Sequence, residues 1–308
     1  MNPRLARFAW LVLSWNVLVI LWGAYVRATG SGAGCGAHWP LCNGEVMPRA
    51  PDTAMLIEFS HRLSSGLALV AVLALAMWIR RSVAAGHPAR RAGMASVVFI
   101  VVEALLGAGL VLFRLVAQDE SLARTMVMPL HLANTMVLLL CLTLTAHFLS
   151  GGAPVAISGR ARTFGLLLAL LVLMIGVGKT GAIAALGDTL YPSTSLLDGL
   201  KSDLDPASAL LLRLRILHPA LGVSVGVLLV FGAAAIPLAA RDRRGSLAKR
   251  AVIVLAAGQV LLGFVNVWLL APVWMQLTHL LVADLLWIAL VVLTASALSR
   301  PDAGATTG

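Results

Sequence analysis

Long runs of apolar residues alternate along this chain with short polar segments. A helix needs about 20 apolar residues to cross the hydrocarbon of a membrane, and eight runs come close to that length. Inside lipid, only a helix satisfies its own backbone hydrogen bonds within a single run, so the pattern predicts an all-α membrane protein with eight transmembrane helices. These helices are predicted at residues 8–26, 59–79, 94–113, 126–148, 162–178, 216–239, 251–270 and 274–297, and the fifth is the shortest.

The second half of the chain repeats the pattern of the first half. EFSHRLSSGLALVAV matches RILHPALGVSVGVLL, EALLGAGLVLF matches QVLLGFVNVWL, and MVMPLHLANTMVLLL matches VWMQLTHLLVADLLW. A fainter echo pairs VRATGSG at Val26 with VGKTGAI at Val177. Repeats of this kind indicate duplication, so we predict two pseudo-symmetric four-helix bundles, residues 1–150 and 151–308. The first half has an extra outer-loop segment before its fourth helix.

The charges of the chain are sparse and unevenly placed. Of 308 residues, 12% are charged, and the formal net charge is +10. In a soluble protein this excess would suggest nucleic acid, but here the bases gather in alternate loops, as they do on the cytoplasmic side of membrane proteins. We therefore predict cytoplasmic termini, the lipid bilayer as the surroundings, and no nucleic-acid partner. The bases assigned to that side are Arg4, Arg7, Arg80, Arg81, Arg90, Arg91, Arg160, Arg162, Arg241, Arg243, Arg244, Lys249, Arg250 and Arg300.

Four of the seven histidines lie near the outer ends of even-numbered predicted helices. They are His61, His131, His218 and His279. A lone membrane histidine often just links two helices by a hydrogen bond, but four at one depth indicate function, because ionisable groups are expensive there. Zinc or copper would need further ligands that are not supplied in both halves. A heme iron needs only axial ligands, so we predict one heme site in each half, near the extracytoplasmic face.

Arginines next to these histidines are candidates to hold heme propionates, because guanidinium groups form strong charge-assisted bonds to carboxylates. The candidates are Arg62, and Arg213 with Arg215. Each of them could equally extend to lipid phosphates at the membrane surface.

A carboxylate distinguishes the first half from the second. Glu58 lies three residues before His61, on the same helix face, whereas Arg215 takes that place before His218. A glutamate beside a heme could accept protons or stabilise a developing positive charge, and the alternative is a structural salt bridge. This difference points to the first half as the reactive one and to the second as a fixed redox centre.

Two cysteines also set the first half apart. Cys35 and Cys42 lie in the first outer loop, an oxidising location that favours a disulfide over free thiols or a zinc-binding pair. The sequence does not show whether such a disulfide is structural or redox-active.

Together, the segments TGSGAGCGAHWPLCNG, IEFSHRL, HLANT, LRILHPALG and QLTHLLVADLLW closely resemble the heme A synthase family, over nearly the whole chain. The resemblance implies an eight-helix oxidoreductase that converts heme O to heme A. In this reaction, successive hydroxylations would oxidise the methyl group on porphyrin carbon 8 to a formyl group for cytochrome c oxidase biogenesis. The resemblance also implies a resident heme b as cofactor.

The resemblance assigns a role to each matching residue. Glu58 would be catalytic, and Cys35 and Cys42 match the first-loop pair of the family. The second pair that many relatives carry between the fifth and sixth helices is missing here. The axial ligands would be His61 and His131 for the substrate or product heme, and His218 and His279 for heme b.

The expected surroundings also follow from the resemblance. It implies a bacterial plasma membrane, a heme O synthase as a partner, and the cytochrome oxidase assembly machinery. The electron acceptor (a quinone or another), the oxygen source and a homo-oligomeric state stay open. The main alternative is a non-enzymatic di-heme b-type electron-transfer protein. A transporter is the second alternative, but its polar groups should lie at mid-membrane, whereas these histidines are expected near one face.

Overall fold

Eight membrane-length helices make up this computed structural model, which describes residues 2–239 and 242–299. Arg241 and Arg300, assigned above to the cytoplasmic side, lie outside the described residues. The all-α membrane fold is confirmed. The spanning helices are α1 (Pro3–Ala28), α2 (Thr53–Ser82), α3 (Pro88–Leu112), α4 (Leu122–Leu149), α5 (Ala161–Leu190), α7 continued by α8 (Leu210–Arg215 and Leu217–Ala235), α9 (Arg243–Trp268) and α10 (Val273–Ala297).

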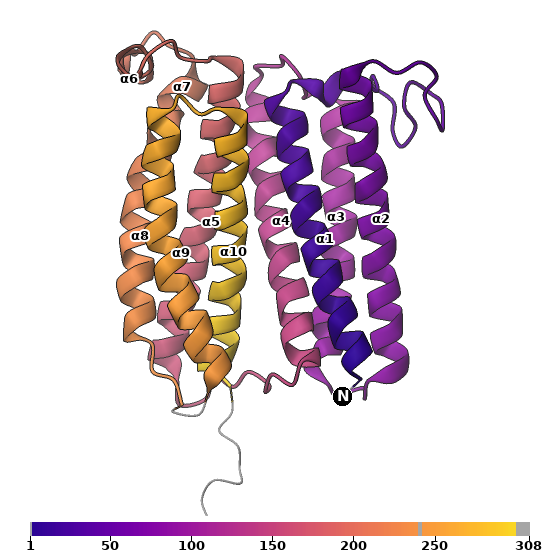
Figure 1. The fold of residues 1–308 in the computed structure, drawn as a ribbon, viewed down its shortest axis with the longest axis vertical. Helices are drawn as coiled ribbons and strands as arrows, with labels where there is room; N and C mark the ends of the chain where they lie inside the picture. Colours follow the sequence, from indigo (N-terminus) through magenta and orange to yellow (C-terminus); the bar gives the residue numbers. More distant parts are fainter. Residues whose placement is uncertain (1, 240–241, 300–308) are drawn as a thin grey trace, which may run out of the picture.

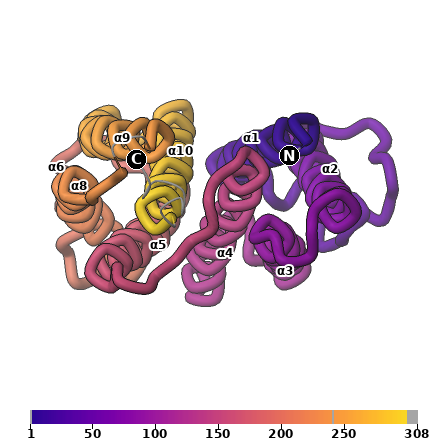
Figure 2. The backbone as a smooth tube through the Cα atoms, turned by 90° about the horizontal axis from the view of Figure 1, so that it is seen from below, coloured from indigo at the N-terminus to yellow at the C-terminus, as the bar shows by residue number. Residues whose placement is uncertain are grey.

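The helices form two groups that stand side by side, α1–α4 and α5–α10 (Figure 1). Seen from below in Figure 2, each group surrounds its own centre. The N-terminus and the loops α2–α3, α4–α5 and α8–α9 lie at one end of the molecule. We call the opposite end the outer end. It carries a short 3-10 helix, η1 (Ser31–Ala33), and the nine-residue helix α6 (Leu196–Leu204).

The fifth spanning helix is longer than predicted. Its apolar run was expected to end at residue 178, but α5 has 30 residues and ends at Leu190. The polar residues that close the apolar run do not end the helix, because each has a suitable environment. Lys179 is exposed, and Asp188 accepts a hydrogen bond from Arg215 at 3.0 Å.

The sixth spanning helix begins earlier than predicted, at Leu210 instead of residue 216, and is interrupted on the way. Proline has no backbone N–H, so Pro219 leaves the carbonyl of Arg215 without its usual helical donor. The helix breaks at Ile216 and resumes as α8 at Leu217. The break lies directly before His218.

The ends of α3 and α9 provide a structural sign of the duplication. After α3, the N–H of Leu115 donates to the carbonyl of Leu110, and after α9 the N–H of Ala271 donates to that of Asn266, each at 2.8 Å. The residue before each donor has a positive φ, 57° and 60°. Both helices therefore end in the same six-residue closure that satisfies terminal carbonyls. The outer loop after α3 is the longer one, in agreement with the predicted extra segment.

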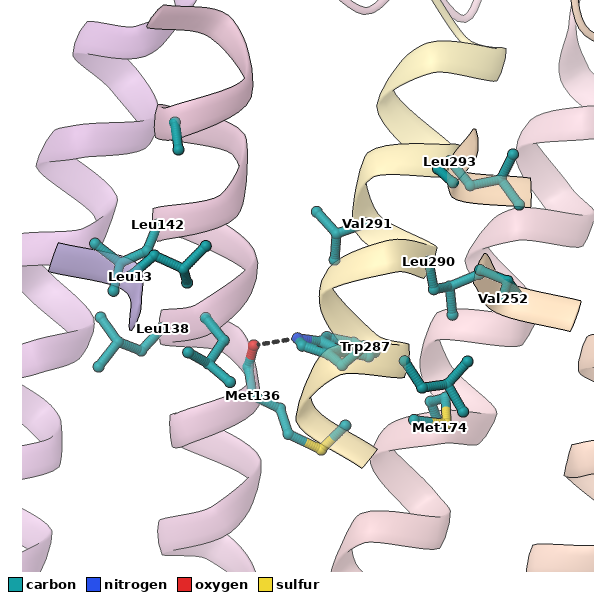
Figure 3. Packing of buried hydrophobic residues seen from close by; sticks show 14 of the residues in the cluster. Leu13, Met136, Leu138, Leu142, Met174, Val252, Trp287, Leu290, Val291 and Leu293 are labelled. Atoms are coloured by element: carbon teal, nitrogen blue, oxygen red, sulfur yellow. Dashed lines mark hydrogen bonds between the residues drawn. The ribbon is translucent and has the colours of Figure 1, made fainter. Parts of the chain in front are cut away.

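A buried tryptophan joins the two halves at the middle of the molecule. Trp287 on α10 is fully buried, and its Nε1–H donates to the backbone oxygen of Met136 on α4 at 2.8 Å (Figure 3). A buried indole usually finds such a partner, so this bond fixes α10 against α4. Other buried residues of the same cluster are Leu13, Leu138, Leu142, Val252, Leu290 and Leu293.

Candidate functional site

The four histidines lie at similar depths near the outer end. His61, His131 and His218 each follow the first residue of their spanning helix by eight or nine residues, and His279 follows the start of α10 by six. A helix rises about 1.5 Å per residue, so the rings lie roughly 9–14 Å below the helix ends.

Each histidine ring packs against a glycine of a neighbouring helix. A Cβ atom added at Gly23 would stand 2.9 Å from His61 Cε1, and one added at Gly181 would stand 3.0 Å from His218 Cε1. The other two rings lie slightly farther away, with 3.4 Å from Gly263 to His279 and 3.9 Å from Gly107 to His131. Real Cβ atoms hardly ever approach so closely as the first two, so glycine gives these rings their room. Both halves repeat this arrangement.

The glycine contacts correct the alignment of the first helix of one half with the first helix of the other. Matching Val26 with Val177 would pair Gly181 with Gly30. The residue of α1 that occupies the equivalent place against a histidine ring is Gly23, two helical turns earlier. The echo in the sequence therefore misaligned the first helices of the two halves. The matches that begin at Glu58 and Glu103 agree with the structure, whereas the match that begins at Met126 sets His131 against Thr278, one residue before His279.

In the second half, the two histidines meet directly. The ring centres of His218 and His279 are 6.2 Å apart, and the ring planes are perpendicular. Thr180 Oγ1 lies 3.3 Å from His218 Nδ1. The amide nitrogen of Gln259 lies 3.2 Å from His279 Nε2 and also donates to the His279 carbonyl at 3.0 Å. Polar neighbours thus orient both rings.

In the first half, a second carboxylate lies beside a histidine. Glu103 Oε1 is 3.6 Å from His131 Nδ1, close enough for charge interaction but too far for a hydrogen bond. Asn134 donates to Glu103 Oε2 at 2.6 Å, and the Thr135 hydroxyl donates to Oε1. The Nδ1 atoms of His61 and His131 are both buried without a hydrogen-bond partner. Among the described residues, these two rings show no direct contact of the kind seen in the second half.

Glu58 is buried with both carboxylate oxygens engaged. The backbone N–H of Cys35 donates to Oε2 at 2.7 Å. Arg62 donates to Oε1 through Nη2 at 2.5 Å and through Nε at 3.1 Å. Charge-assisted bonds of this kind are roughly twice as strong as neutral ones. Glu58 is therefore held firmly in one position, one helical turn before His61.

Arg62 also holds the cysteine loop. Its Nη1 donates to the backbone oxygens of His38 and Leu41, at 2.5 and 2.7 Å. Both carbonyls lie inside the ring that the Cys35–Cys42 disulfide closes. The disulfide, the loop and Glu58 are thus one connected unit.

The arginines predicted to hold propionates differ in their surroundings. Arg62 is committed to Glu58 and the loop. Arg215 is buried and pairs with Asp188 at 3.0 Å and with Asp203 at 2.7 Å. Arg213 is exposed. The structure therefore gives Arg62 and Arg215 protein partners that the sequence did not suggest.

A further arginine links the two halves near the outer end. Arg27 on α1 donates to the Ala185 carbonyl at 2.5 Å, to the Thr189 hydroxyl at 2.7 Å and to Gln276 Oε1 at 2.9 Å. No local motif in the sequence marks Arg27, because its partners are remote in the chain.

A second link between the halves lies outside the membrane-spanning segments. The Tyr191 hydroxyl donates to Glu120 Oε2 at 2.5 Å. This hydrogen bond, more than partial burial, raises the pKa of the Tyr191 phenol to about 12. The bond therefore persists well above neutral pH.

Comparison with known families decides the affiliation. The family model described as cytochrome oxidase assembly protein, COX15-CtaA, matches residues 6–291. The chain belongs to the COX15-CtaA family. Relatives named heme A synthase, from Alkalihalophilus pseudofirmus and Halalkalibacterium halodurans, are each 42% identical over 113 residues, 37% of this chain and 38% of their own length. The resemblance to the heme A synthase family is confirmed.

The relatives of this chain differ in length and in the names they carry. Two proteins named protoheme IX farnesyltransferase, from two strains of Thermus thermophilus, are 51% identical over 301 residues, which is 96% of this chain and 49% of theirs. The chain spans about half the length of these two relatives.

Proposed function

We propose that this chain is a heme A synthase that oxidises the C8 methyl group of heme O to a formyl group by successive hydroxylations. In this proposal His61 and His131 bind the substrate or product heme, and His218 and His279 bind a resident heme b. The observation that carries it is the buried Glu58 beside one histidine pair but not the other, within a chain of the COX15-CtaA family.

The residues fit a heme in the second half. His218 and His279 would hold this heme, since their rings are neighbours with centres 6.2 Å apart. His279 Nδ1 is buried without a hydrogen-bond partner, so one nitrogen of that ring stays available. Gly181 and Gly263 leave room for the two imidazole rings.

The residues of the first half fit the same group. The Nδ1 atoms of His61 and His131 are buried without a hydrogen-bond partner, so each ring keeps one nitrogen available. Within the described ranges, no group of three or more His, Cys, Asp and Glu residues could hold a bare metal ion. This supports a metal that brings most of its own ligands, as heme iron does.

The role proposed for Glu58 follows from its contacts. A bound heme supplies the redox chemistry, and the chain supplies the charge beside it. Because both oxygens of Glu58 accept hydrogen bonds, a fixed negative charge that stabilises positive charge on the substrate agrees best with the geometry. A proton-accepting role would require Oε1 to leave Arg62. In this proposal the disulfide between Cys35 and Cys42 is structural: it holds the loop so that the N–H of Cys35 points at Glu58.

The names of the Thermus relatives raise a second activity, prenyl transfer. A diphosphate substrate is usually held through Mg²⁺ on carboxylates, and the part of the chain that the structure describes has no such cluster. The family match and the relatives named heme A synthase favour oxidation of heme O.

Heme analysis tests the proposal. The chain is produced in cells that lack their own heme A synthase but contain a heme O synthase, and the extracted hemes are separated and weighed by mass spectrometry. Heme A together with heme b is expected. Heme b alone, with heme O unused, would favour the electron-transfer alternative. Heme O formed in cells without a heme O synthase would favour prenyl transfer.

A charge-neutral variant tests the role of Glu58. Glu58→Gln keeps the size of the side chain, so both hemes should still bind, while heme A formation should fall by roughly 10²–10³-fold, the usual cost of one electrostatic group. Glu45→Gln is the matched control, since the side chain of Glu45 is about half exposed and pairs only loosely with Arg49, at 4.0 Å. Unchanged heme A in Glu58→Gln would remove the catalytic assignment.

A further inference from the structure

A short helix at the outer end presents leucines to the surroundings. Helix α6, Leu196–Leu204, joins α5 to α7 and lies at the lateral edge of the molecule, away from α1–α4 (Figures 1 and 2). No role in the proposed heme chemistry accounts for it.

The apolar residues of α6 form one stripe. Successive residues of a helix are offset by 100°, so positions i, i+1, i+4 and i+8 fall within an arc of about 100°. The leucines at these positions have large exposed fractions: Leu196 47%, Leu197 62%, Leu200 50% and Leu204 61%. A stripe this exposed on a nine-residue helix requires a covering environment.

Contacts at one border of the stripe fix how α6 is rotated. Asp203 pairs with the buried Arg215 at 2.7 Å, and Gly199 is buried against the Ser193 hydroxyl, where an added Cβ would stand 2.9 Å away. Ser195 caps the first turn by accepting from the N–H of Asp198 at 3.2 Å. Because Arg215 is anchored in α7, the leucine stripe cannot turn inward without breaking this ion pair.

The connections of α6 keep it close to the membrane. Five residues, 191–195, follow α5, and five, 205–209, precede α7. Five residues of extended chain reach at most about 18 Å, so α6 stays near the ends of two spanning helices. Leu210 and Leu217 of the following helices are also exposed.

We propose that α6 is an interfacial helix whose leucine stripe inserts into the membrane leaflet nearest the four histidines. The partner is the boundary between lipid headgroups and acyl chains. Lys201 lies at the border of the stripe, where its long side chain can extend to lipid phosphates. The helix thus ties the Asp203–Arg215 ion pair, and with it the start of the segment that carries His218, to the membrane surface.

Fluorescence quenching in vesicles tests this insertion. Single cysteines replace Leu200 and Ser202 in full-length chains whose buried Cys141 is changed to alanine, and each is labelled with a small environment-sensitive dye. Ser202 lies on the opposite side of α6 from the stripe and is the matched control. The vesicles contain phosphatidylethanolamine and phosphatidylglycerol, with a lipid that carries a nitroxide near the top of its acyl chain. Gel filtration and retained heme verify that each variant is folded.

The expected result is opposite behaviour of the two labels. Interfacial helices bury their apolar face roughly 5–10 Å deep, so the nitroxide lipid should quench the Leu200→Cys label at least about threefold more than the Ser202→Cys label. Aqueous iodide should quench the Ser202→Cys label more. Equal iodide access at both sites would overturn the proposal. Protection of the Leu200→Cys label from both quenchers would also overturn it, since a protein surface would then cover the stripe.

Discussion

The two halves of this molecule keep the same histidines but surround them with opposite charges. In the first half, a buried carboxylate, Glu58, precedes His61 and is held by an arginine and a loop N–H. In the second half, a buried guanidinium, Arg215, precedes His218 and is held by two aspartates. The inversion shows that the duplicated frame serves equally to fix either sign of charge beside a histidine.

The next position differs as well. Arg62 follows His61, and Pro219 follows His218. Arg62 connects its helix to the disulfide loop, whereas Pro219 lies just after the interruption of its helix at Ile216. Glu103 beside His131 corresponds to Gln259 beside His279. The ring–glycine contacts are common to both halves, so the neighbours of the histidines, and not the histidines themselves, separate the functions proposed for the two halves.

Removal of one histidine should have the largest effect and should be confined to one half. His279→Ala is expected to abolish binding of heme b while heme O still binds, and His131→Ala should do the reverse, because a heme iron held by two protein ligands depends on both. Heme per chain, with the identity of the extracted heme, measures this. His38→Ala is the control, since that side chain is exposed in the loop. Loss of both hemes from either variant would contradict independent sites.

Loss of the Arg215 side chain should destabilise the second half most. Arg215→Leu leaves Asp188 and Asp203 without their partner, and breaking a buried pair in this way costs about 3–5 kcal/mol. The midpoint of thermal unfolding in detergent should fall clearly. Arg49→Leu, at an exposed and loose pair, should leave the midpoint unchanged. Equal midpoints for the two variants would mean that the Arg215 pairs contribute nothing.

The ring–glycine contacts can be broken in either half. Gly23→Ala and Gly181→Ala place a methyl group 2.9 and 3.0 Å from a histidine ring. Overpacking of this kind costs roughly 1–3 kcal/mol, so heme affinity of the affected half should fall by roughly 5–200-fold. Heme titration of the depleted protein measures the change. Gly66→Ala on α2, where an added Cβ meets nothing within 4 Å, should bind heme normally. Equal affinities in all three variants would show that the glycines do not shape the sites.

Exchange of Glu103 and Gln259 should have the smallest effect, because it changes only one neighbour of a histidine in each half. Glu103→Gln gives His131 the neighbour that His279 has. Groups that orient a metal-binding histidine usually matter by 10–100-fold, and at 3.6 Å we expect about tenfold slower heme A formation, with a shifted heme spectrum. Gln259→Glu should shift only the spectrum of heme b. Identical spectra in both variants and wild type would show that this position does not tune the hemes.

The sequence predicted the features that are local or periodic. Apolar runs defined the eight spanning helices, and the spacing of His61, His131, His218 and His279 indicated the repeat. The predicted length of α5 was wrong. The apolar run ends before Lys179, but the helix continues through polar residues such as Asp188, whose hydrogen-bond partner lies in a remote segment. The sequence contains Pro219 after His218, but it did not show that Arg215 would pair with two aspartates.

The sequence could not predict contacts between remote segments. Asp203 and Asp188 are 12 and 27 residues from Arg215, and Arg27 finds its partners about 160 and 250 residues away. The same holds for the glycines that support the histidine rings, since a glycine in an apolar run looks like any other. The loop contact of Glu58 depends on how residues 34–42 fold back onto α2, which no periodicity encodes.

The most direct test of the account is the heme content of each half in the purified wild-type chain. After expression with an adequate supply of heme O, the account predicts one heme in each half. Low-temperature electron paramagnetic resonance should show low-spin iron bound by two histidines, and the signal of one half alone should vanish in His279→Ala. A chain that binds a single heme, or none, under these conditions would contradict it.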